Sequence, residues 1–164
     1  MYQYSGPGSQ QVNNDWNSAD DFWFAMLAQQ GYIVACVDGR GTGFKGAEFK
    51  KCTQKELGKF EVEDQIDAAK VIGSYSYVDA SRIGIWGWSY GGFMTSSLML
   101  RKPDAFKVGV AGGPVVDWKW YEVMYGERYM DTPAENQKGF DEASVLNYVK
   151  DLKGKLLLIH GTSD

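Results

Sequence analysis

The chain has 164 residues, of which 44% are hydrophobic and 23% are charged, and these values exclude a disordered or collagen-like protein. At this length one domain can bury a core without disulfides or metals. The 17 basic and 21 acidic residues give a net charge of -4, which argues against nucleic acid and anionic membranes as partners.

The first predicted helix spans residues 22–30, with a start resembling a capping box at Ser18 and Asp21 and an end at Gly31. It leads into residues 32–37, a continuous β-prone run that is typical of a strand covered on both faces. No basic residue precedes Arg40 and no apolar stretch approaches about 18 residues, so we expect neither a signal peptide nor a membrane anchor.

A second helix is predicted over residues 61–72, because Val62, Ile66 and Ala69 repeat at helical spacing behind an acidic first turn that includes Glu61. A strand, a helix, a strand, an irregular aromatic segment and a last strand are then predicted at residues 82–86, 93–101, 108–111, 118–129 and 156–159. Strands separated by helices indicate an α/β fold with a mostly parallel sheet and helices on both faces. Ligands of such sheets bind beyond the carboxyl ends of the strands.

The sharpest motif is the Gly-x-Ser-x-Gly pattern of Gly87, Ser89 and Gly91, which lies between a predicted strand and a predicted helix. That context favours a nucleophile elbow, in which a strained turn exposes a serine at a helix N-terminus. A glycine-rich turn with an incidental serine and a phosphate loop would give similar patterns. The chain lacks the Gly-Lys-Ser/Thr of a P-loop, so we prefer the elbow.

A serine nucleophile needs a histidine that takes its proton and a carboxylate that orients the histidine. The order in hydrolases of this type is serine, acid, histidine, so Asp164 fits the acid. His160, the one histidine of the chain, precedes Asp164 by four residues and does not fit the base. We interpret His160 as a residue that shapes the turn of the acid. The third member of the triad is therefore missing from these residues.

The two cysteines give no sign of a disulfide framework or a zinc cluster. Cys36 lies inside an apolar run and Cys52 lies beside Lys51. We interpret them as separate thiols, although a bridge between them stays open.

Six motifs together resemble one enzyme family. They are Gly87-Trp88-Ser89-Tyr90-Gly91-Gly92, Phe60-Glu61-Val62-Glu63-Asp64-Gln65, Tyr4-Ser5-Gly6-Pro7-Gly8, Asp38-Gly39-Arg40-Gly41, Tyr125-Gly126-Glu127-Arg128-Tyr129 and His160-Gly161-Thr162-Ser163-Asp164. They resemble the catalytic domain of the prolyl oligopeptidase family, most closely its dipeptidyl peptidase IV type. The resemblance covers essentially the whole chain. It implies an α/β-hydrolase fold truncated before its last strand and helix, and lacking the family's β-propeller.

The resemblance assigns roles to particular residues. Ser89 matches the nucleophile and Asp164 the acid, while the Tyr4 hydroxyl and the Tyr90 N–H match the donors of the oxyanion hole. The pocket for the residue before the scissile bond matches Val115, Trp118, Tyr121, Tyr125 and Tyr90. Without the resemblance we would interpret Tyr4 as packing a hairpin near Pro7 and the later aromatic residues as a core-facing helix stripe.

The resemblance thus implies a serine peptidase that cleaves after proline or alanine near a peptide N-terminus, without a metal or other cofactor. The family's glutamate pair for the free amino group belongs to the propeller, so these residues do not support release of either a dipeptide or a tripeptide. A prolyl tripeptidyl peptidase stays open as a second interpretation, because it is resembled equally by Gly112-Gly113-Pro114-Val115 and Tyr125-Gly126-Glu127-Arg128. An inactive hydrolase-fold interaction module and an esterase also stay open.

We expect this chain alone to be inactive, because its catalytic histidine is missing, and to self-associate through an exposed edge near residues 156–159. For the full-length enzyme, the family suggests a periplasmic or cell-surface location and allows a homodimer.

Overall fold

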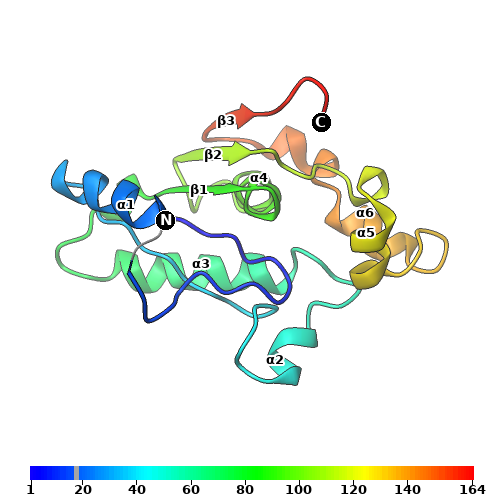
Figure 1. The fold of residues 1–164 in the computed structure, drawn as a ribbon. Coiled ribbons are helices and arrows are strands. Elements are labelled where there is room, and N and C mark those ends of the chain that lie inside the picture. Colours follow the sequence, from blue (N-terminus) through cyan, green and yellow to red (C-terminus); the bar gives the residue numbers. More distant parts are fainter. Residues whose placement is uncertain (17–18) are drawn as a thin grey trace.

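The computed structural model describes residues 1–16 and 19–164 and centres on a parallel sheet (Figure 1). Its strands β1 (Gly84–Trp88), β2 (Val108–Gly112) and β3 (Lys155–Ile159) are hydrogen-bonded in the order β1-β2-β3. The arrowheads of the strands point to the side where α5 (Val123–Met130) and α6 (Gln137–Ala143) lie. The α/β class with a parallel sheet is therefore as predicted.

The first residues of the chain extend this sheet beyond β1. Tyr2 forms isolated parallel bridges with both Trp86 and Cys36. The Gln3 N–H donates to the Trp86 carbonyl at 3.2 Å, and the Met1 amino group donates to the Gly84 carbonyl at 2.6 Å. Residues 1–3 thus lie between β1 and the segment at Cys36.

The prediction of a strand at residues 32–37 is wrong. Only Cys36 pairs, through its bridge with Tyr2, and the neighbouring segment of residues 1–3 offers too short a partner for a ladder. The side chains of Tyr32 and Ile33 are 63% and 53% exposed, so this run is also not covered on both faces. A β-prone composition supplies the propensity, but a strand forms only where a partner pairs with it.

Helices cover both faces of the sheet. Helix α4 (Tyr90–Arg101) lies against β1 and β2, is buried throughout residues 90–100, and packs on α3 (Phe60–Gly73). Successive strand residues point to opposite faces, so Trp86 faces away from α4 and meets α1 (Ala19–Gln29) instead. The Phe24 ring of α1 lies 5.9 Å from the Trp86 ring.

Helix α1 ends as the sequence predicts. Gly31 has a φ of 88°, and its N–H donates to the Ala28 carbonyl at 3.0 Å. The Tyr32 N–H donates to the Leu27 carbonyl at 3.1 Å, which completes a Schellman motif. The predicted cap residue Ser18 lies outside the described residues.

Several boundaries differ from the prediction. β1 begins two residues late because Asp79 accepts from the Ser81 N–H at 2.9 Å and caps the short 3-10 helix η1 (Ala80–Arg82). Helix α4 begins at Tyr90, so most of the glycine-rich turn is strand end and helix start. Residues 118–129 are not irregular, because they form the 3-10 helix η2 (Trp118–Trp120) and most of α5. The structure also contains α2 (Ala47–Lys51), α6 and η3 (Val145–Asp151), none of which was predicted.

Two further properties of the described residues concern the cysteines and the length of the apolar helices. Cys36 and Cys52 are both free thiols. Across residues 1–16 and 19–164, no helix combines the length and the apolar character needed to cross a membrane.

Candidate active site

Ser89 occupies a strained turn between β1 and α4. Its backbone has φ 58° and ψ -115°, a conformation that a residue with a Cβ rarely adopts. The turn is held from both sides, since the Ser89 N–H donates to the Gly112 carbonyl at 2.8 Å and the Phe93 N–H donates to the Ser89 carbonyl at 3.0 Å. This strand-turn-helix geometry is the one predicted for a nucleophile elbow.

The glycines of the motif let other backbone segments pass close to the turn. A Cβ at Gly91 would lie 2.6 Å from the Gln3 carbonyl oxygen, which is closer than real side chains approach. A Cβ at Gly87 would also meet Gln3, and one at Gly92 would meet the Gly112 carbonyl. The Gln3 side chain secures the contact by donating to the Gly91 carbonyl at 2.8 Å. The elbow is therefore built against residues 1–3 and the end of β2.

A small pocket of about 20 Å³ opens at the elbow. Its lining consists of Tyr4, Ser89, Tyr90, Val115, Trp118, Tyr121 and Tyr125. The structure thus brings the aromatic residues singled out in the sequence, together with Val115, into one lining with Ser89. These residues come from three separate parts of the chain, and spacing alone does not reveal that the three parts meet.

The aromatic rings of the pocket pack in defined geometries. Trp118 stacks on Tyr125 with ring centroids 5.7 Å apart at 13°, and it meets Tyr121 edge-on at 5.5 Å and 85°. The Tyr90 ring lies 5.5 Å from Trp118 and 6.1 Å from Tyr4. Tyr4 follows the segment that pairs with β1, so it packs against the pocket and not in a hairpin. Such rings form a flat apolar slot.

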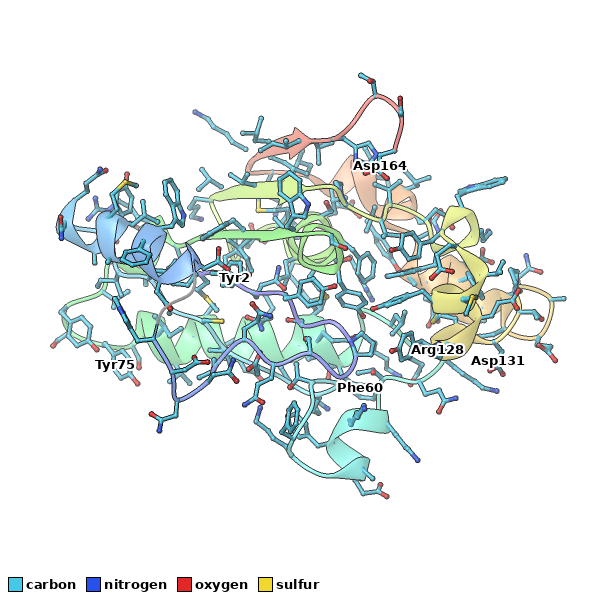
Figure 2. The ribbon with its side chains drawn as sticks, in the orientation of Figure 1. Tyr2, Phe60, Tyr75, Arg128, Asp131 and Asp164 are labelled. Carbon is cyan, nitrogen blue, oxygen red and sulfur yellow. The ribbon has the colours of Figure 1, made fainter. Side chains whose placement is uncertain are left out.

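Asp164 lies at the carboxyl ends of the strands, where Figure 2 labels it. A Cβ at Gly113, the residue after β2, would lie 3.9 Å from Asp164 Oδ2. His160 Nδ1 lies 3.6 Å from Asp164 Oδ2, and the two side chains are 46% and 67% exposed. His160 is thus a neighbour of the predicted acid, as expected for a residue of the same turn.

Glu61 is a polar neighbour of the pocket to which no role in the site was assigned from the sequence. The Tyr90 hydroxyl donates to Glu61 Oε1 at 2.6 Å, and the Gly58 N–H donates to Glu61 Oε2 at 3.1 Å. The residue is only 1% exposed, and this burial raises the pKa of Glu61 to about 7. Burial, followed by the charge of Glu61, also raises the pKa of Tyr90 well above its usual range.

A signal for Glu61 was present in the sequence. Glu61, Gln65 and Ala69 recur every four residues and form one buried stripe of α3. Two polar residues on that stripe indicate hydrogen-bonding tasks inside the core. Gln65 meets this expectation, because its side chain donates to the Val37 carbonyl at 2.8 Å.

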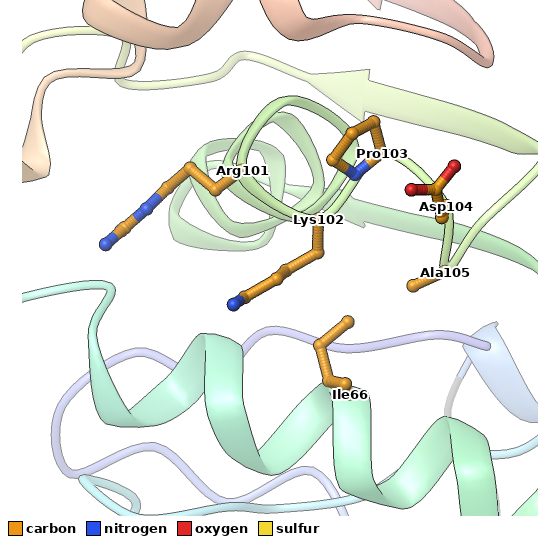
Figure 3. A pocket seen from close by; sticks show the side chains of 6 residues that line it. All are labelled: Ile66, Arg101, Lys102, Pro103, Asp104 and Ala105. Atoms are coloured by element: carbon orange, nitrogen blue, oxygen red, sulfur yellow. The ribbon is translucent and has the colours of Figure 1, made fainter.

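A larger hollow of about 310 Å³ lies elsewhere, between α3 and the end of α4 (Figure 3). It is lined by Ile66, Arg101, Lys102, Pro103, Asp104 and Ala105. It shares no residue with the pocket at Ser89 and offers no serine, cysteine or histidine among its lining residues. We therefore assign the candidate site to the smaller pocket.

Comparisons with known proteins show the family of the chain. The family model described as "Prolyl oligopeptidase family" matches residues 17–164. Probable dipeptidyl-aminopeptidase B of Pyrenophora tritici-repentis is 46% identical over 166 residues, covering 100% of this chain and 19% of the relative. The corresponding protein of Paracoccidioides lutzii is 47% identical over 166 residues, covering 100% of this chain and 18% of the relative.

Two solved structures share the fold. The crystal structure of Porphyromonas gingivalis dipeptidyl peptidase 4 matches with a TM-score of 0.92 and 52% identity, covering 96% of this chain and 22% of that one. A putative dipeptidyl aminopeptidase IV from Bacteroides ovatus matches with a TM-score of 0.93 and 48% identity, covering 97% of this chain and 22% of that one. The chain therefore spans about a fifth of the length of these proteins.

Proposed function

The chain belongs to the prolyl oligopeptidase family, and from that premise we propose that it forms part of a serine peptidase that cleaves peptides after proline or alanine near the N-terminus. The observation that carries the proposal is the single pocket in which Ser89 lies beside Tyr4, Tyr90, Trp118 and Tyr125. The names of the relatives, dipeptidyl-aminopeptidase and dipeptidyl peptidase, support release of a dipeptide.

In this proposal Ser89 Oγ attacks the carbonyl carbon of the scissile bond and forms an acyl-enzyme. The oxyanion accepts hydrogen bonds from the Tyr4 hydroxyl and the Tyr90 N–H, each worth about 2.7–4 kcal/mol in the transition state. A histidine takes the Ser89 proton and returns it to the leaving amine. Asp164 orients that histidine, which we place later in the natural protein than residue 164.

The pocket favours proline through shape and apolar burial. Its rings present flat faces and edges around a space of about 20 Å³, and such faces pack against a proline ring without a charged partner. Alanine fits the same slot but buries less apolar surface, so we propose it as the weaker substrate residue.

The activity of the isolated chain tests the assignment of the base. Losing the general base of a serine hydrolase can cost about 10⁶ in turnover. We expect the purified chain to leave a Gly-Pro anilide intact, and the longer protein purified from its natural source to cleave it. Turnover by the chain alone that disappears in Ser89→Ala would contradict the proposal.

Two competing functions are separated by simple measurements. Mass analysis of the product released by the natural protein distinguishes a dipeptide from the tripeptide of a prolyl tripeptidyl peptidase. An inactive interaction module would show no turnover of proline amides or acyl esters by that protein. The strained backbone of Ser89 argues against the module, because binding alone does not require it.

We also propose that the isolated chain self-associates. Leu157 and Leu158 of β3 are each 56% exposed, and β3 pairs with β2 on one side only among the described residues. An exposed apolar strand edge is a template for pairing with another chain. Light scattering over a concentration series tests this, and a monodisperse monomer at high concentration would count against it.

A further inference from the structure

The Glu61 carboxylate connects three parts of the chain near the pocket. One oxygen accepts from Tyr90, the first residue of α4, and the other accepts from the N–H of Gly58, just before α3. Gly58 is held in turn by Arg101 at the far end of α4, whose Nη1 donates to the Gly58 carbonyl at 2.9 Å. Both ends of α4 are thus hydrogen-bonded to the region where α3 starts, and Glu61 forms the hydrogen bond at the end next to Ser89.

Plain core packing does not account for a carboxylate at this position. Glu61 is 1% exposed, and its two hydrogen-bond donors are a hydroxyl and an amide rather than a cation. A buried acid costs free energy that a leucine of similar size would not. The groups that act electrostatically on it are Tyr90 and Arg101 of α4, Tyr125 of α5, and Cys52 after α2.

The partner of Glu61 has two tasks in the proposed function. The ring of Tyr90 forms a wall of the pocket, and its backbone N–H is the proposed donor beside the nucleophile. The start of α4 fixes the backbone end of this residue. The hydrogen bond to Glu61 fixes the hydroxyl end, so the ring is held at both ends between Phe93 and Trp118.

We propose that Glu61 is a positioning residue of the site at Ser89. By accepting hydrogen bonds from the Tyr90 hydroxyl and the Gly58 N–H together, it fixes the position of the Tyr90 ring, which forms a wall of the pocket. Only a carboxylate accepts with both oxygens, whereas glutamine accepts with one. The consequence for substrate selection rests on the proposed function. The effect of Glu61 on the position of the Tyr90 ring does not, because both residues belong to this chain.

The hold on the ring is tested in the 164-residue chain with Glu61→Gln. The matched control is Glu63→Gln, because Glu63 lies on the same helix with a side chain that is 51% exposed and pairs with Arg40 at 3.0 Å. In chains with isotope-labelled tyrosine, we expect Glu61→Gln to move the ring signals of Tyr90, and Glu63→Gln to leave them in place. Identical spectra of the two variants would overturn the proposal.

Tyr90→Phe removes the other partner of the same hydrogen bond. The signals that disappear in this variant are those of Tyr90. The variant keeps the ring and removes the hydroxyl that Glu61 accepts. In the unaltered chain, we expect Glu61→Gln to shift the signals of Tyr4 and Tyr125. In the Tyr90→Phe background we expect Glu61→Gln to cause no further shift of these signals, because the contact is already lost. Changes that add independently in the double variant would show that Glu61 acts elsewhere, and would overturn the proposal even if Glu61→Gln folds poorly.

Kinetics of the longer natural protein test the catalytic consequence. We expect Glu61→Gln to raise the KM for a proline substrate roughly tenfold and the KM for an alanine substrate less, because alanine depends less on the wall of the pocket. A merely structural loss would lower the active fraction and leave the ratio of the two kcat/KM values unchanged, which would overturn the catalytic consequence. Absence of turnover in the unaltered protein would refute the proposed function instead, and the tyrosine spectra would then decide on Glu61.

Discussion

Two turns at the carboxyl end of the same sheet are built in different ways. The turn at Ser89 is followed by a helix that is buried from residue 90 to residue 100, and backbone from two other segments closes around it. The turn from His160 to Asp164 carries side chains that are 46% and 67% exposed. The position of the nucleophile is therefore set by the core of this chain, whereas the side chains of His160 and Asp164 lie at the surface of the described residues.

The largest effect is expected from closing the space at the first turn. Gly91→Ala would place a methyl group 2.6 Å from the Gln3 carbonyl oxygen, so the segment of residues 1–3 would have to leave β1. We expect the free energy of unfolding to fall by about 4 kcal/mol. Denaturant unfolding followed by circular dichroism measures it.

The same substitution at the second turn is the control. A Cβ at Gly161 would lie 3.4 Å from the Asp164 Cβ, which is an ordinary contact. Gly161→Ala should therefore change the free energy of unfolding by less than about 0.5 kcal/mol. Equal losses at the two turns would remove the contrast between them.

The next largest effect is a dependence of stability on pH, which comes from Glu61 next to the turn at Ser89. The folded pKa of Glu61 is about 7, above its ordinary value of 4.5, so the folded chain holds this proton more tightly than the unfolded chain does. The stabilisation is complete below pH 4.5 and is lost as the pH rises through 7. We expect the contribution of Glu61 to the free energy of unfolding to fall by about 2.5 kcal/mol between pH 5 and pH 8.

A second buried group acts in the opposite direction and makes the test sharper. Burial lowers the pKa of the Met1 amino group to about 6 from 8.0, so its contribution to stability is lost as the pH falls through that range. In Glu61→Gln only this contribution remains, and we expect stability to rise between pH 6 and pH 8. The same dependence of stability on pH in Glu61→Gln and in the unaltered chain would exclude a contribution of Glu61.

A smaller effect concerns the strain at Ser89. Glycine adopts the observed φ of 58° without the steric cost that a Cβ imposes, so Ser89→Gly should raise the free energy of unfolding by about 1 kcal/mol. Ser89→Ala keeps the Cβ and should not stabilise the chain. A gain in both variants would point to the loss of the hydroxyl rather than to relief of strain.

The smallest effect on stability is expected at the exposed strand β3. Leu157→Lys should shift self-association toward monomer in light scattering while changing the free energy of unfolding by less than about 0.5 kcal/mol, since Leu157 is 56% exposed. Leu156 points toward Gly109 and Met99 on the helix-covered face, so Leu156→Lys should destabilise the chain instead. Unaltered association in Leu157→Lys would place the contact elsewhere.

The sequence predicted those elements whose pattern is strong. The spacing of Val62, Ile66 and Ala69 gave α3 to within one residue at either end, and the Gly-x-Ser-x-Gly context gave the elbow. The short helices α2, α5 and α6 escaped prediction because five to eight residues carry little periodicity. Residues 32–37 were mispredicted because strand formation depends on a distant partner, here Tyr2.

The site was predictable only in part from individual residues. Ser89 follows from its motif, but the grouping of Tyr4 with Trp118 and Tyr125 came from the family resemblance. Spacing alone would assign those aromatic residues to a core stripe, because it does not report which segments meet across the sheet. Glu61 was missed for a related reason, since an acid in a first helical turn ordinarily faces solvent.

The position of residues 1–3 in the sheet limits how early this part of the protein can fold during synthesis. Met1 bonds to Gly84, 83 residues later, so this segment finds that neighbour only after the whole interval between them has been made. At about 5–20 residues per second, synthesis of that interval takes roughly 4–17 s. During that time residues 1–3 cannot pair with β1. The apolar and aromatic side chains around them are then available to chaperones or to other nascent chains.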